Sequence, residues 1–274
     1  NSEIDIIYIA LPNSYHYEWI NKCIDSKKNI LVEKPITKNF FQLENIKKKL
    51  MQKNFKISIY EGFMYKYHAQ TKKVLELISN DEIGEILKID SSFGVNLLTK
   101  KKFWFFKKKK KINKDGRLFN KNLGGGSILD LGCYPVSLIT MLMETLGYTT
   151  FDKYKIFEKN IELGETGVDI DSRIEMKIDN KIHIVLSSSF KRNIGTLTKI
   201  FGSKGSIEIP NLWFGSSNII LKKNKTEHII KFDKVDDPYF NQINEISNNL
   251  LKNNINQNLD NMLLNMKIID QWLN

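Results

Sequence analysis

The chain has 274 residues, 41% of them hydrophobic and 27% charged, which is enough for a sizeable core in one large domain or two smaller ones. Two cysteines, Cys23 and Cys133, and four scattered histidines exclude a disulfide framework and a metal cluster and favour a reducing, cytoplasmic location. No apolar run approaches the length of a membrane span, and the net charge of +11 comes mostly from lysines spread along the chain.

The first sixty residues alternate between strand and helix patterns. Apolar strands are predicted at residues 3–10, 29–32 and 56–60, with helices at about residues 15–25 and 40–53. Asn13 or Ser14 is the expected cap of the first helix. This order with short links is typical of a parallel sheet, which binds ligands at the carboxyl ends of its strands. The three predicted strands are followed by Leu11-Pro12-Asn13, by Glu33-Lys34-Pro35 and by Glu61-Gly62.

A basic, aromatic segment follows a helix predicted at residues 70–80 and a strand predicted at residues 85–96. Residues 100–111 contain eight lysines and four aromatic residues. Aromatic rings among lysines can stack nucleic-acid bases. The alternative is a loop whose aromatic side chains pack inward while its lysines stay solvated. We favour the loop, which makes nucleic acid the less favoured partner.

Three glycines, Gly124 to Gly126, lead into a helix-like apolar pattern. Glycine lets the backbone approach a ligand closely, and a helix start attracts electron-rich groups. Asp130 and Tyr134 are four residues apart, so a helix would place a carboxylate and a phenol on one face, where an acid–base pair is possible. The alternative is a surface helix with an exposed aspartate and a packed tyrosine. Pro135 predicts a kink at Tyr134.

From residue 154 onward strand patterns dominate. Several alternate between apolar and polar residues, which is typical of half-buried antiparallel strands, and Asn180 is a predicted hairpin turn. Strands are predicted at residues 155–163, 171–178, 182–190, 196–201, 206–209, 219–221 and 228–232, and helices at 239–253 and 259–273. The fold class is therefore α/β plus α+β: an incomplete Rossmann-type parallel sheet followed by a C-terminal domain with a large, mostly antiparallel sheet.

The sequence resembles the Gfo/Idh/MocA oxidoreductases, closest to the glucose–fructose oxidoreductase and dihydrodiol dehydrogenase branch. The order and spacing of several motifs across nearly the whole chain carry this resemblance. They are residues 5–13 with His16, 31–35, 61–68, 117–119, 124–135, 166–169 and 202–207. The family's Gly-x-Gly-x-x-Gly fingerprint does not occur, so we expect the missing part of the nucleotide-binding domain to lie before residue 1.

The resemblance implies two domains, a nucleotide-binding remainder at residues 1–62 and a substrate and dimerisation domain at residues 63–274, whose last helix returns to the first. It implies NAD or NADP as cofactor, a sugar or polyol as substrate, and a homo-oligomer through the C-terminal sheet. Its cofactor-binding residues would be Leu11, Pro12, Asn13, His16, Glu33, Lys34 and Pro35. Its substrate-binding residues would be Tyr65, Gly125 and Gly126.

We predict hydride transfer to or from a carbinol carbon, with Lys34, Tyr134 and Asp130 as catalytic residues. Tyr134 would carry the proton, because a nearby ammonium such as Lys34 lowers the pKa of a phenol from about 10. Asp130 would orient the lysine or the substrate. Arg117 would anchor the loop that carries it by binding a carboxylate. The alternatives are a non-catalytic remnant without cofactor and a basic nucleic-acid-binding protein.

Overall fold

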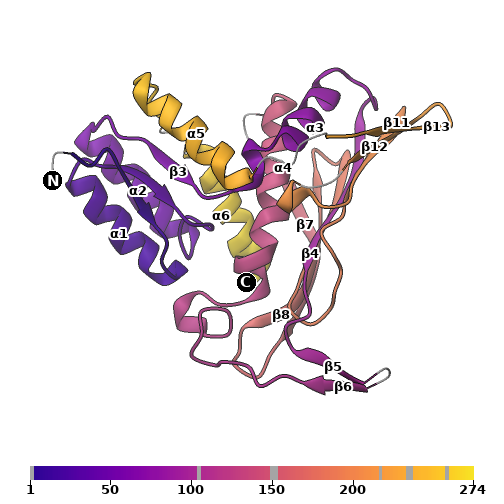
Figure 1. Ribbon diagram of the computed structural model, residues 1–274, viewed down its shortest axis with the longest axis horizontal. Coiled ribbons are helices and arrows are strands. Elements are labelled where there is room, and N and C mark those ends of the chain that lie inside the picture. Colours follow the sequence, from indigo (N-terminus) through magenta and orange to yellow (C-terminus); the bar gives the residue numbers. More distant parts are fainter. Residues whose placement is uncertain (1–2, 104–105, 149–153, 216–217, 233–236, 257–258) are drawn as a thin grey trace.

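The computed structural model describes residues 3–103, 106–148, 154–215, 218–232, 237–256 and 259–274. Its first part is a three-stranded parallel sheet in the order β1-β2-β3, with two helices between the strands, as predicted (Figure 1). The elements are β1 (Ile6–Ile9), α1 (Asn13–Asp25), β2 (Asn29–Val32), α2 (Phe40–Lys53) and β3 (Ile59–Glu61).

The two helices of this part begin differently. The Asn39 side chain accepts a hydrogen bond of 3.0 Å from the backbone N–H of Gln42 and so caps α2. By contrast, α1 has no side-chain cap, and the predicted cap at Asn13 or Ser14 is wrong. The Asn13 amide instead donates to the Gly124 carbonyl at 3.1 Å, which ties this loop to a distant segment.

The second part is built on an eight-stranded sheet in the order β13-β12-β11-β10-β4-β9-β8-β7. The β4–β9 pair is parallel and the other neighbouring pairs are antiparallel, so the prediction of a mostly antiparallel sheet is confirmed. Asp179 and Asn180 both have positive φ, which confirms the predicted hairpin turn between β8 and β9. The strands are β4 (Ile86–Gly94), β7 (Tyr154–Leu163), β8 (Asp169–Ile178), β9 (Ile182–Ser189), β10 (Thr198–Gly202), β11 (Gly205–Ile209), β12 (Ile219–Lys223) and β13 (Thr226–Ile230).

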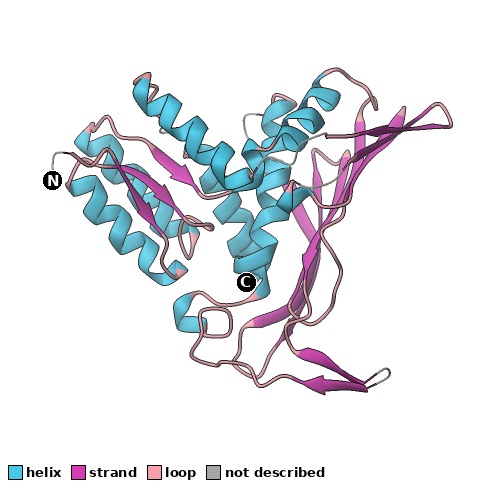
Figure 2. Cartoon of the chain, in the orientation of Figure 1, coloured by secondary structure: helices cyan, strands magenta, loops and turns pink. Residues whose placement is uncertain are grey.

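Helices lie between the two sheets (Figure 2). A π-helix, η3 (Ile128–Gly132), runs directly into α4 (Cys133–Thr145), and α6 (Asp260–Leu273) packs against α4, η3 and α2. The backbone N–H of Phe40 donates to Asp270 Oδ2 at 2.7 Å, which joins the last helix to α2. The remaining helical elements are η1 (Met64–Tyr67), α3 (Ala69–Ser79), η2 (Lys121–Leu123), η4 (Leu212–Phe214) and α5 (Pro238–Leu251).

Two sequence predictions are corrected here. The stretch Lys121–Thr145 is long and apolar enough to cross a membrane by length and composition, but 89% of the 18-residue window that meets this test is buried within the protein, so it is a core helix. The basic, aromatic segment is not simply a loop, because β5 (Thr99–Phe103) and β6 (Phe106–Lys109) pair as an antiparallel hairpin. The predicted inward packing of its aromatic side chains concerns side chains outside the described part of the chain.

Candidate active site

Lys34 lies where the two parts of the protein meet. It follows β2, and its ammonium Nζ donates to the backbone carbonyl of Asp130 at 2.6 Å and to Asp130 Oδ1 at 3.2 Å. The Lys34 side chain is only 13% exposed. Burial alone would lower the pKa of Lys34, but its neighbours Tyr134 and Asp130 outweigh burial and hold that pKa above its ordinary value. The ammonium is therefore charged at neutral pH.

Asp130 links two cations. Its Oδ1 accepts from Lys34 and also from Arg117 Nη1 at 2.9 Å, which confirms the predicted anchoring of Arg117 by a carboxylate. Burial alone would raise the pKa of Asp130, but the Lys34 ammonium and then the Arg117 guanidinium hold it below its ordinary value. Asp130 sits in the π-helical turn that precedes α4.

Tyr134 packs beneath the lysine inside an aromatic cluster. The Lys34 Nζ lies 4.9 Å from the centroid of the Tyr134 ring, so the ammonium and the phenol, 100 positions apart, do converge. The ring centroids of Phe63 and Phe93 each lie 5.3 Å from that of Tyr134. The hydroxyl donates to the Met64 thioether sulfur at 3.8 Å.

The predicted effect of Lys34 on the phenol has the right sign, but burial outweighs it. Burial raises the pKa of Tyr134, and the favourable charge of Lys34 offsets only part of that increase. Tyr134 is 7% exposed, and each ring around it removes water that would solvate a phenolate. The phenol is therefore protonated at neutral pH, and Tyr134 does not itself line the pocket described next.

A pocket of about 250 Å³ opens beside Lys34 at the carboxyl ends of β1 and β2. Its lining includes most of the expected residues of both strand ends and four residues given no ligand contact from sequence, Tyr8, Ala10, Arg117 and Leu123. The Tyr8 hydroxyl donates to Glu33 Oε1. The position of Tyr8 near the carboxyl end of β1 is the sequence feature that could have identified it as a pocket residue. The lining residues are Tyr8, Ala10, Leu11, Pro12, Asn13, Glu33, Lys34, Arg117 and Leu123.

His16 holds the two strand-end loops together and has no exposed surface. Its Nδ1 lies 2.9 Å from the Pro35 carbonyl oxygen and its Nε2 lies 2.8 Å from the Leu11 carbonyl oxygen. Burial, the largest influence, lowers the pKa of His16. Neither the His16 side chain nor Pro35 lines the pocket. His16 instead contacts the backbone of the two loops whose other residues line it.

The glycine run packs closely against other parts of the protein. A Cβ on Gly125 would lie 2.7 Å from the Leu118 carbonyl oxygen. Gly126 has φ of +120°, and a Cβ there would lie 2.1 Å from Asp169 Oδ1. Neither glycine lines the pocket beside Lys34, which does not support the predicted substrate contacts of Gly125 and Gly126.

The helix start that was expected to attract a ligand is already capped. Asp169 Oδ2 accepts from the Ser127 hydroxyl and from the backbone N–H of Ile128, both at 2.7 Å. Asp169 comes from β8 and is 4% exposed, so a carboxylate of this chain fills the anion site. Burial raises the pKa of Asp169, although these hydrogen bonds oppose the increase.

Tyr65, the third predicted substrate contact, is a core residue. It is fully buried, and its hydroxyl lies 2.7 Å from the Ser137 hydroxyl. Its ring also packs edge-on against Trp213, with centroids 5.1 Å apart. The geometry therefore makes Tyr65 a support of the cluster around Tyr134.

A small parallel sheet with a pocket at its strand ends faces a large second sheet across buried helices, which is a Rossmann-type part joined to a second, mostly antiparallel part. The chain belongs to the GFO/IDH/MocA family. The family model described as "GFO/IDH/MocA C-terminal domain" matches residues 71–208. The model described as "Oxidoreductase family, NAD-binding Rossmann fold" matches residues 1–61.

Relatives and solved structures agree with this assignment. Trans-1,2-dihydrobenzene-1,2-diol dehydrogenase from Xenopus laevis is 28% identical over 231 residues, 84% of this chain and 62% of that protein. A dTDP-3,4-didehydro-2,6-dideoxy-alpha-D-glucose 3-reductase from Saccharopolyspora spinosa is 26% identical over 76% of this chain and 56% of its own length. The chain thus spans less than two thirds of these relatives.

The same fold occurs in crystal structures of low sequence identity. Aldose-aldose oxidoreductase from Caulobacter crescentus, complexed with glycerol, matches with a TM-score of 0.82 and 16% identity over 99% of this chain and 77% of that one. The 3-ketoreductase KijD10 from Actinomadura kijaniata, in complex with NADP and TDP-benzene, matches with a TM-score of 0.79 and 17% identity over 98% of this chain and 78% of that one.

Proposed function

We propose that this protein is an NAD(P)-dependent oxidoreductase that transfers a hydride to or from a carbinol carbon of a sugar, polyol or related substrate. The observation that carries the proposal is the Lys34 ammonium, held by Asp130 beside a pocket at the strand ends. The two relatives named above are a dihydrodiol dehydrogenase and a deoxysugar 3-reductase, whose names describe reactions at this kind of group.

The residues around the pocket fit the nicotinamide end of a dinucleotide. The pocket has a volume of about 250 Å³, which is below the ~300–1,000 Å³ usual for a pocket that holds a whole ligand. Leu11, Pro12 and Asn13 would border the ring, and Glu33 would face the ribose. When bound, the nicotinamide supplies the hydride or accepts it. The protein must then only position the reacting groups and manage one proton.

Lys34 would donate a hydrogen bond to the reacting oxygen of the substrate and stabilise the negative charge that develops there. Asp130 keeps the ammonium charged and oriented. Tyr134 stays our prediction for the proton carrier, and because burial raises the pKa of its phenol, it would donate its proton readily in the direction of carbonyl reduction and accept one less readily in the direction of oxidation. In the same proposal, His16 and Pro35 support the cofactor loops from behind.

We also propose the division into residues 1–62 and 63–274, which follows the two family matches. The two cysteines are free and buried, which is compatible with work in the cytoplasm. A homo-oligomer would form on the outer face of the large sheet, where Phe157 and Phe201 are 48% and 36% exposed. Size-exclusion chromatography with light scattering tests this assembly. A protein that is monomeric at a concentration of about 50 µM would refute it.

Cofactor binding is the direct test of the proposed function. NADH and NADPH are titrated into the full-length protein and followed by nicotinamide fluorescence. Leu11→Glu places a negative charge at the pocket, and Phe41→Glu introduces the same charge at a 71% exposed site on α2. We expect binding that is weakened at least about tenfold by the first change and unaltered by the second. An absence of binding to either nucleotide would favour the non-catalytic alternative.

A further inference from the structure

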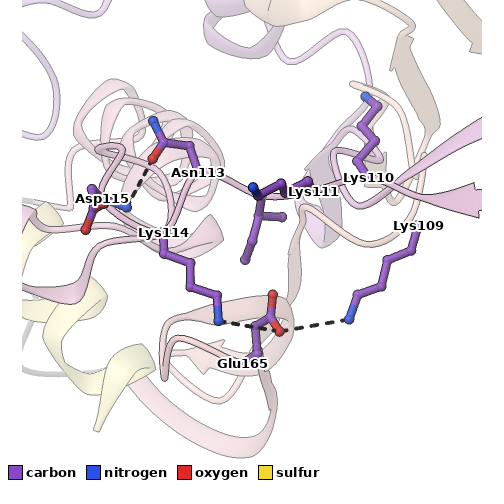
Figure 3. Close-up of a pocket in the computed structure, with 8 residues that line it drawn as sticks. Lys109, Lys110, Lys111, Asn113, Lys114, Asp115 and Glu165 are labelled. Carbon is purple, nitrogen blue, oxygen red and sulfur yellow. Dashed lines mark hydrogen bonds and ion pairs between the residues drawn. The ribbon is translucent and has the colours of Figure 1, made fainter.

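The charged side chains outside the pocket of Lys34 differ in their exposure. The cleft beside the loop after β6 holds exposed ones, since Lys109, Lys114 and Glu165 in its lining are 77%, 61% and 44% exposed (Figure 3). Water solvates such groups, so their charge by itself indicates no ligand. Glu61, by contrast, is only 6% exposed. A buried carboxyl group is costly unless it is hydrogen-bonded, so the contacts of Glu61 show what it does.

Glu61 lies at the end of the small sheet, beside the loop of residues 33–36 that carries Lys34. It is the last residue of β3 and pairs with Val32, the last residue of β2. Lys34 follows Val32 by two residues. The Gly62 N–H also donates to the Val32 carbonyl at 2.7 Å, which holds the two strand ends together. The Glu61 side chain therefore extends from a fixed backbone next to this loop.

Glu61 binds the backbone of the loop directly. Its Oε1 accepts a hydrogen bond of 2.9 Å from the N–H of Ile36, and both residues are buried. Because Pro35 has no backbone N–H, Ile36 carries the first backbone donor after Lys34. His16 contacts the Pro35 carbonyl of the same loop at 2.9 Å. Two side chains, one from α1 and one from β3, thus fix the backbone that follows Lys34.

The placement of this backbone decides whether Lys34 reaches Asp130. Lys34 Nζ donates to the Asp130 carbonyl at 2.6 Å and to Asp130 Oδ1 at 3.2 Å. The second distance is near the upper limit for a hydrogen bond, so a shift of the loop by about 0.5 Å would break it. Glu61 does not line the pocket, so its contact with the site runs through the loop.

The Glu61 carboxyl group has both reach and charge. Burial raises the pKa of Glu61, and the Lys66 ammonium is the strongest influence that opposes the increase. The Lys34 ammonium opposes it more weakly than Lys66 does. A carboxyl or amide oxygen without charge can accept the same N–H. The hydrogen bond to Ile36 thus depends on the length of the side chain rather than on its charge.

We propose that Glu61 is a positioning residue, which holds Lys34 against Asp130 through the backbone N–H of Ile36. Its consequence for catalysis rests on the proposed function, whereas the placement of Lys34 does not. Two variants separate reach from charge. Glu61→Gln keeps an acceptor oxygen at the same distance and removes the charge. Glu61→Asp keeps the charge but is shorter by one bond of about 1.5 Å, so it no longer reaches Ile36.

The reactivity of the Lys34 amine reports its placement without substrate or cofactor. The full-length protein is labelled with a trace of acetic anhydride at one fixed pH, and peptide mass spectrometry gives the labelling of Lys34 relative to Lys22, which is 55% exposed. Only an uncharged amine reacts, so a lysine that has lost the Asp130 carboxylate reacts faster. Asp270→Ala is the matched control, because it removes another carboxylate from a backbone N–H, that of Phe40, at 2.7 Å.

We expect the relative labelling of Lys34 to rise at least about fivefold in Glu61→Asp and to stay within about twofold in Glu61→Gln and Asp270→Ala. In an Asp130→Asn background, Glu61→Asp should add less than about twofold, because the carboxylate contact is already gone. A rise in Glu61→Gln would overturn the proposal, and this variant remains a test if Glu61→Asp does not fold. No rise in Glu61→Asp, an equal rise in Asp270→Ala, or a full further rise in the Asp130→Asn background would overturn it too.

NADPH is titrated in parallel into the wild-type protein. An absence of NADPH binding together with the expected labelling would reject the proposed function and leave the positioning role of Glu61 in place. NADPH binding together with unchanged labelling in Glu61→Asp would reject the positioning role alone.

Discussion

Replacing Asp130 by asparagine tests whether its carboxylate keeps Lys34 charged. The change removes one negative charge, 3.2 Å from Lys34 Nζ, and keeps the backbone carbonyl that accepts from the same ammonium. At an effective dielectric constant of about 20, two unit charges at 3.2 Å interact by about 5 kcal/mol, or about 4 pKa units. Solvent reaches both partners, since their side chains are 13% and 14% exposed, so we expect the pKa of Lys34 to fall by about 1–3 units.

The direction follows from burial. Burial lowers the pKa of Lys34 in the wild type and in the variant. Without the Asp130 carboxylate, one of the charges that raises this pKa is gone, so the pKa falls. Competitive trace acetylation with acetic anhydride over a range of pH, followed by peptide mass spectrometry, gives the titration midpoint of each lysine without a substrate. Lys22, 55% exposed, is the reference in every digest.

Asp171→Asn is the matched control variant, because Asp171 is 17% exposed and bonded to Arg192 far from Lys34 in the sequence. We expect the midpoint of Lys34 to fall in Asp130→Asn alone. If it stays unchanged in that variant, or falls equally in Asp171→Asn, then the carboxylate of Asp130 is not what maintains the charge of Lys34, and the proposed role of Asp130 is wrong.

Three further changes test the site and its scaffold. Lys34→Met should lower kcat about 10²–10³-fold with NADPH affinity within about threefold, because it removes the proposed electrostatic stabilisation, and an unchanged kcat would contradict that role. Tyr134→Phe should slow carbonyl reduction about 10²-fold or more if the phenol carries the proton, whereas full activity, measured as NADPH oxidation, would assign the proton elsewhere. Gly126→Ala should lower stability in urea by more than about 2 kcal/mol, since its Cβ would meet Asp169 Oδ1 at 2.1 Å at positive φ. Gly147→Ala, also at positive φ but with open space around it, should cost only about 1 kcal/mol, and equal losses would refute the clash.

The sequence alone determined the order and type of the main elements. Residues 29–32 and 40–53 were predicted with the bounds that β2 and α2 have, because the apolar pattern that marks them is a local feature. The motif order also identified the family, and with it Lys34. Local patterns fail where pairing decides the outcome, as in the β5–β6 hairpin, whose lysine-rich strands resemble a solvated loop.

Only the tertiary structure decided the chemistry of the site. Asp130 and Lys34 are 96 positions apart, so no local pattern reports the ion pair that keeps Lys34 charged. Tyr134 was expected to lose its proton easily, but rings from distant segments exclude water from it and raise its pKa. Asp169 fills the helix start that a ligand was expected to use. The burial of a side chain and the charges near it are fixed only when segments far apart in the chain have packed together, so they cannot be predicted from local sequence.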